Sequence, residues 1–86
     1  MTTLPSDIYS AYPAKPGMED AKQALLVLLR RAESDFLDIA MRIEALQTIG
    51  LKSMVKALEF VEENILTEMT MLCLLIEDVT IKPTIN

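Results

Sequence analysis

Two long stretches without glycine or proline dominate this sequence of 86 residues. They run from residue 18 to 49 and from 51 to 79, and only Gly50 separates them. Proline interrupts helices and an internal glycine weakens them, so each stretch can form one unbroken helix. Glycine readily adopts the left-handed conformation that ends many helices, which predicts that Gly50 ends the first one. A connection this short forces the two helices to lie antiparallel.

The chain therefore divides into an arm, a hairpin and a tail. Three of the four prolines stand in residues 1–17, and we expect an extended arm there because proline disfavours a regular helix. Residues 80–86 are expected to form a short extended tail. The predicted fold class is all-α, an antiparallel two-helix hairpin with an extended N-terminal arm. The hairpin, residues 18–79, is predicted in three pieces: helix 1 at about 18–49, a turn near 50–52 and helix 2 at about 53–79.

Apolar residues recur at every third or fourth position in both helices, which predicts the seam along which the helices touch. Both sets step 3-4-3-4-4-3-4-3, a coiled-coil-like spacing with one irregularity, a stutter, in the middle. The predicted seam residues of helix 1 are Met18, Ala21, Leu25, Leu28, Ala32, Phe36, Ile39, Ile43 and Leu46. Those of helix 2 are Leu51, Met54, Leu58, Val61, Ile65, Met69, Leu72, Ile76 and Val79.

Both helices carry more apolar side chains than one seam can bury. Residues 24–29 read ALLVLL and residues 71–76 read MLCLLI, and folding at Gly50 brings both runs to the open end of the hairpin. Leaving large apolar side chains in water would forgo about 1.5–3 kcal/mol each. The arm has few apolar groups, so we expect a second copy to supply most of the cover and to form a homodimeric four-helix bundle. The predicted interface residues are Leu26, Leu29, Leu37, Met41, Val55, Phe60, Leu66, Met71, Cys73 and Leu75.

Composition excludes several classes of function. The net charge of −5 argues against binding to nucleic acid or to an anionic membrane surface. Apolar runs of six residues are far shorter than the roughly 20 that span a bilayer. The chain has no histidine, which removes His-based catalytic triads and imidazole metal ligands. One cysteine and no recognisable signal peptide lead us to expect a cytoplasmic protein.

Acidic residues provide the one pattern that suggests chemistry. Glu59, Glu62 and Glu63 are spaced to share one side of helix 2, and carboxylates grouped in this way can hold Mg²⁺. The stretch EFVEE resembles half of the ExxEE-plus-ExxD signature of all-α nucleotide pyrophosphohydrolases such as the MazG family. The second half is missing, because Glu77 and Asp78 lack its spacing and lie at the far end of the same helix. No functional residue is carried over from that family, and a solvated acidic face is the favoured interpretation.

The sequence thus favours a small non-catalytic protein-interaction module, a regulator, anti-activator or adaptor acting through an apolar helical surface. The expected partners are a second copy of the chain and another protein, with no cofactor and no metal. One alternative is a small chaperone or co-chaperone that shields a partner helix, since the chain resembles short acidic helical-hairpin secretion chaperones in size and charge. The other is a Mg²⁺-dependent all-α hydrolase that uses the acidic cluster.

Overall fold

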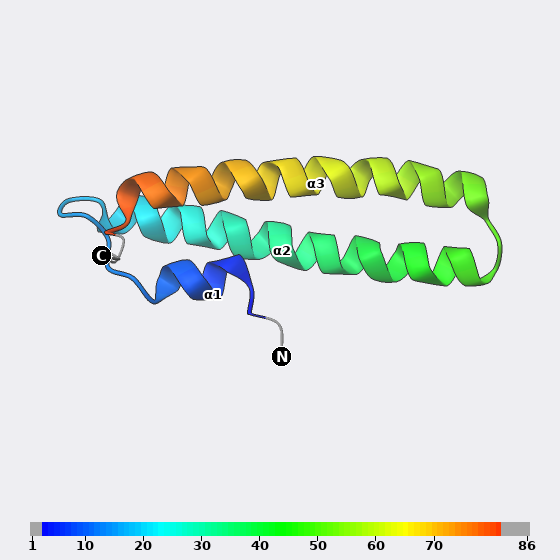
Figure 1. The fold of residues 1–86 in the computed structure, drawn as a ribbon, viewed down its shortest axis with the longest axis horizontal. Helices are drawn as coiled ribbons and strands as arrows, with labels where there is room; N and C mark the ends of the chain where they lie inside the picture. Colours follow the sequence, from blue (N-terminus) through cyan, green and yellow to red (C-terminus); the bar gives the residue numbers. More distant parts are fainter. Residues whose placement is uncertain (1–2, 82–86) are drawn as a thin grey trace, which may run out of the picture.

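Two long antiparallel helices, lying side by side, form the body of the molecule (Figure 1). The computed structural model describes residues 3–81, which contain three helices. Helix α2 spans Glu19–Thr48 and helix α3 spans Lys52–Val79. The prediction of an all-α fold is confirmed, and both long helices begin and end within one residue of the predicted bounds.

A complete Schellman motif ends α2 and turns the chain into α3. Gly50 adopts a positive φ of 78°, as the sequence predicted. Its amide donates to the carbonyl oxygen of Gln47 at 3.2 Å, and the amide of Leu51 donates to the carbonyl oxygen of Leu46 at 3.1 Å. These two bonds satisfy carbonyl groups that the end of a helix otherwise leaves unpaired.

The arm is not extended throughout, which corrects the sequence prediction. Helix α1 spans Pro5–Ser10 and lies alongside the first half of α2 (Figure 1). Pro5 occupies the first turn of α1, where its missing N–H needs no helical partner and its fixed φ suits a helix. The proline that seemed to forbid a helix therefore begins one.

The chain ends of the hairpin are tied together beyond α1. Ala14 and Thr80 form an isolated antiparallel bridge, flanked by hydrogen bonds from the amide of Lys15 to the carbonyl of Val79 and from the amide of Ile81 to the carbonyl of Pro13. Thr80 is extended, as expected for the start of the tail. The rest of the predicted tail, residues 82–86, and the first two residues of the arm lie outside the described residues.

The seam between α2 and α3 follows an uninterrupted heptad pattern, without the predicted stutter. Lys22 and Leu29 are buried where Ala21 and Leu28 were expected, and Val55 is buried in place of Met54. Glu62 is half-buried, whereas its neighbour Val61 is exposed. The seam runs from residue 22 to 46 in α2 and from 55 to 79 in α3. In both helices its residues are spaced 3-4-3-4-3-4-3.

Candidate functional site

Three of the ten predicted interface residues are buried by the chain itself. Leu26 and Leu29 belong to the core cluster at the open end of the hairpin, together with Ala32, Leu72 and Ile76. Tyr9 of α1 packs against the same cluster, so the arm covers part of the apolar belt that we expected to remain bare. Val55 is buried because the regular heptad places it in the seam. These three side chains are not available to a partner in this structure, which corrects the expectation that a hairpin leaves them uncovered.

Cys73 is half-buried next to α1. Burial raises the pKa of its thiol, and the negative charges of Glu33 and Glu77 raise it further, while a hydrogen bond with Tyr9 acts in the opposite direction. A thiol with a raised pKa stays protonated and is a poor nucleophile. Cys73 of α3 therefore packs next to the arm and is not part of a free surface.

The other six predicted interface residues are exposed on the surface. Their exposed fractions lie between 43% and 70%, which is high for large apolar side chains. Their exposure leaves them accessible on the surface of the hairpin. These residues are Leu37, Met41, Phe60, Leu66, Met71 and Leu75.

Polar contacts hold α1 in place. The amide and the hydroxyl of Ser6 both donate to the carboxylate of Glu33, at 2.9 and 2.5 Å, and both residues are buried. The hydroxyl of Tyr9 donates to the carboxylate of Glu77 at 2.8 Å. Burial and this hydrogen bond raise the pKa of Tyr9 to about 12. The ammonium group of Lys22 donates to the carbonyl oxygen of Tyr12, so that this buried charge also has a partner.

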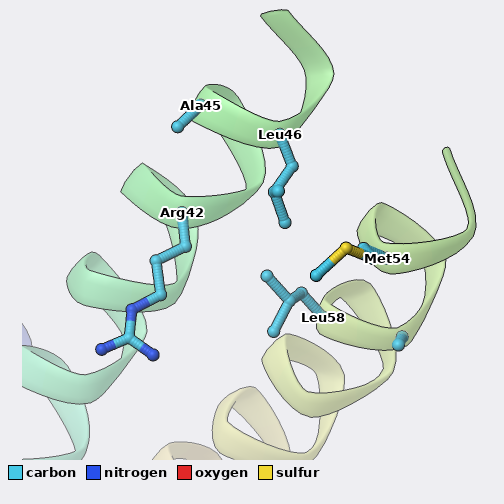
Figure 2. Close-up of a pocket in the computed structure, with 6 residues that line it drawn as sticks. Arg42, Ala45, Leu46, Met54 and Leu58 are labelled. Carbon is cyan, nitrogen blue, oxygen red and sulfur yellow. The ribbon is translucent and has the colours of Figure 1, made fainter. Parts of the chain in front are cut away.

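An open groove lies between α2 and α3 near the hairpin turn (Figure 2). Its volume is about 440 Å³. Leu46 from α2 and Met54 and Leu58 from α3 point toward one another across it, and Arg42 stands at its edge. Ala45 and Ala57 complete the lining, and their small side chains leave room for another backbone or a large side chain to approach. An apolar groove with a single cation suits a hydrophobic protein segment better than a polar metabolite.

Exposed apolar residues continue the groove along the same side of the hairpin. Residues separated by whole heptads share one side of a helix in a regular seam. The sequence prediction placed Leu28 and Val61 in the seam, and the unbroken heptad was the signal that would have placed them beside it. It placed Met71 and Leu75 among the interface residues. We define the groove face as the groove together with four large apolar residues that occupy the same helix positions in other heptads: Leu28, Val61, Met71 and Leu75.

The acidic residues do not form a metal site within the described chain. Glu62 is half-buried in the seam, and Glu59 and Glu63 line a shallow depression together with Lys56. Among residues 3–81, no three acidic or cysteine side chains come together in a way that could hold a metal ion. The hydrolase alternative therefore gains no support from the arrangement of these carboxylates.

Neither hydropathy nor comparison with known proteins assigns a function. Within the part of the chain that the structure describes, no helix combines the length and the apolar character needed to cross a membrane. No protein-family model matches the chain, no curated protein is significantly similar to it, and no solved structure matches it. The argument for function therefore depends on the surface of this molecule alone.

Proposed function

We propose that this chain is a small non-catalytic protein-interaction module, a regulator, anti-activator or adaptor, that binds through its apolar helical surface. The observation that carries the proposal is the groove lined by Leu46, Met54 and Leu58. An amphipathic helix can place apolar anchors, spaced three or four residues apart, into such a groove. The predicted partners remain another protein and a second copy of the chain.

An apolar anchor in the groove would be favourable on energetic grounds. Each large apolar side chain that leaves water there would gain about 1.5–3 kcal/mol. Arg42 lies at the edge, paired with Asp38 at 3.2 Å, and both side chains are mostly exposed. An exposed ion pair of this kind contributes little to stability, so Arg42 is free to turn toward an acidic group on a partner at small cost.

Charge insertion in the groove tests the proposal. Ala57→Glu places a carboxylate in the groove, whereas Thr67→Glu adds the same charge at an exposed position of α3 outside it. We expect a protein captured by the wild type and by Thr67→Glu to be lost by Ala57→Glu. The captured protein, once purified, should bind Ala57→Glu at least about tenfold more weakly in a direct titration, the effect of one lost anchor. Equal binding by both variants would remove the groove from the proposal.

The two alternatives predict different results in simple experiments. A transcription factor as the captured protein would support a regulator, whereas a secretion subunit would support the chaperone alternative. For the hydrolase alternative, Mg²⁺ would have to raise the melting temperature of the wild type, and Glu62→Ala would have to abolish that rise. We expect no effect of Mg²⁺ on either protein.

A further inference from the structure

The hairpin exposes more surface than a compact chain of its mass. Its accessible surface is 6332 Å², whereas a compact monomer of 9.6 kDa is expected to expose roughly 5,100 Å². The radius of gyration is 16.0 Å, against about 12 Å for a compact domain of this length. The surplus of about 1,200 Å² exceeds the roughly 800 Å² per partner that a stable protein interface buries. The elongated chain therefore has enough spare area in total for a stable dimer interface.

The groove face is the side on which exposed apolar residues run along the whole length of the hairpin. Leu28, Met54, Val61, Met71 and Leu75 are each between 40% and 60% exposed, and they extend from the open end to the turn. The opposite side of the seam is already covered by α1 at the open end. A second copy of this chain presents two helices as long as the groove face itself.

The groove face carries a net charge of −2 per copy, against −5 for the whole chain, because the matching heptad positions of α3 add Glu68 and Asp78 to a neutral row of α2. The row of α2 that borders the groove face contains two arginines and two aspartates in its middle, because these residues stand whole heptads from Arg42 or Ala45. This row is neutral, and opposite charges on two copies can pair across it. Its charged members are Arg31, Asp35, Asp38 and Arg42.

We propose that the occupant of the groove face is a second copy of this chain, which packs face to face to form a bundle of four long helices. The two α1 helices lie on the outside of this bundle. The inference rests on the proposed function, which it deepens by naming one partner and its face, and it means that a second copy and a helix of another protein compete for the groove. Leu28, Met71 and Leu75 of each chain then leave water on dimerisation, while Ala45 and Ala57 let the helices approach closely.

Neighbouring residues provide matched variants for the test. Leu74 and Leu75 are adjacent leucines, 58% and 48% exposed, but only Leu75 belongs to the groove face. Phe60 and Val61 form a second pair of this kind. Light scattering between 1 and 100 µM should give twice 9.6 kDa for the wild type. We expect Leu75→Glu and Val61→Glu to weaken the dimer by about 100-fold or more, and Leu74→Glu and Phe60→Glu by less than about threefold.

Circular dichroism of each variant checks that it remains helical. A measurement on the wild type alone gives an independent result: in a sample mixed from isotope-labelled and unlabelled chains, intermolecular NOEs should reach the methyl groups of Val61 and Leu75 but not those of Leu74. A wild type that is monomeric at 100 µM, or variants of both sides that weaken the dimer equally, would overturn the inference. A monomeric wild type whose partner capture still depends on Ala57 would leave the proposed function intact. A wild type that forms the dimer but captures no other protein would support this inference and contradict the proposed function.

Discussion

The open end and the turn end of the hairpin are built differently. At the open end three segments meet, and Leu26, Leu29 and Ile76 are completely or almost completely removed from water. At the turn end only α2 and α3 meet. Leu46 and Leu58 occupy seam positions there but remain half-exposed around the groove.

The difference shows that a short third element is enough to cover one side of the two-helix seam. Two helices can bury one seam, and the flanking positions stay wet unless a third element covers them. Six residues of α1 supply that element at the open end, although a helix so short is not stable in isolation. At the turn end the Schellman motif connects the helices but covers nothing. The turn end and the groove face therefore hold the surface that remains to be covered.

The largest expected difference between the two ends is in the cost of removing a seam leucine. Leu29→Ala removes a fully buried side chain and should lower the free energy of unfolding by about 2–5 kcal/mol. Leu46→Ala makes the same change at a half-buried position and should cost about 1–2 kcal/mol. Urea unfolding at one fixed protein concentration measures both, since any dimer makes stability depend on concentration. Equal costs would mean that the turn end is covered in solution.

Sequence reasoning predicted the helices correctly but misplaced the seam by one position at four sites. At two of these sites it chose an apolar residue over a charged neighbour, Ala21 over Lys22 and Val61 over Glu62, and at the other two both neighbours are apolar. The structure buries the neighbour that keeps the heptad regular, because helix geometry fixes which positions face the partner helix. Lys22 is accepted there because its ammonium group reaches the carbonyl oxygen of Tyr12.

The arm was mispredicted because its structure depends on contacts with residues far away in the sequence. Ser6 bonds to Glu33, and Tyr9 bonds to Glu77, which are 27 and 68 residues apart in sequence. Neither pair has a local pattern that reveals it. Pro5 was interpreted as a helix breaker, although at the first turn of a helix proline is favourable. The predicted interface residue Leu26 lies in the cluster against which Tyr9 packs, whereas Leu29 is buried because it occupies a seam position.

The bond between Ser6 and Glu33 gives the second prediction, for the open end. Ser6→Ala removes the donor of the 2.5 Å hydrogen bond and leaves the buried carboxylate with one bond fewer. We expect a loss of about 2 kcal/mol, because hydrogen bonds to charged groups are stronger than neutral ones. Hydrogen exchange should show faster exchange in α1 and no change near Gly50.

Ser10→Ala is the control for Ser6→Ala, because it makes the same change in the same helix. The hydroxyl of Ser10 donates to the carbonyl oxygen of Asp7 at an exposed site, so its loss should cost less than about 0.5 kcal/mol. If Ser10→Ala released α1 as readily as Ser6→Ala, the buried contact with Glu33 would not be what holds the arm.

Gly50 gives the third prediction, for the turn end. A Cβ at this position would meet nothing within 4 Å, so Gly50→Ala is opposed only by its positive φ. The expected loss is about 1 kcal/mol, the cost of a left-handed conformation for an ordinary residue. Gly50→Asn should lose less, since asparagine tolerates this conformation better. Thermal unfolding of the two variants checks the order, and a larger loss for Gly50→Asn would contradict this account of the turn.

The last expected effect concerns Tyr9, and it disappears at high pH. Its pKa is about 12 in the folded chain against an ordinary value of 10, because burial and the hydrogen bond to Glu77 favour the protonated phenol. A raised pKa means that the contribution of Tyr9 to stability is complete below pH 10 and is lost as the pH rises from 10 to 12. Tyr9→Phe should therefore be less stable than the wild type at pH 8, by about 1 kcal/mol, and the gap should close toward pH 12.

Urea unfolding at each pH measures the difference in stability between Tyr9→Phe and the wild type. The control is Tyr12→Phe, which keeps Tyr9 and should lose stability over this interval in parallel with the wild type. A gap between Tyr9→Phe and the wild type that stays constant to pH 12 would show that the phenol of Tyr9 does not help to hold α1 at the open end.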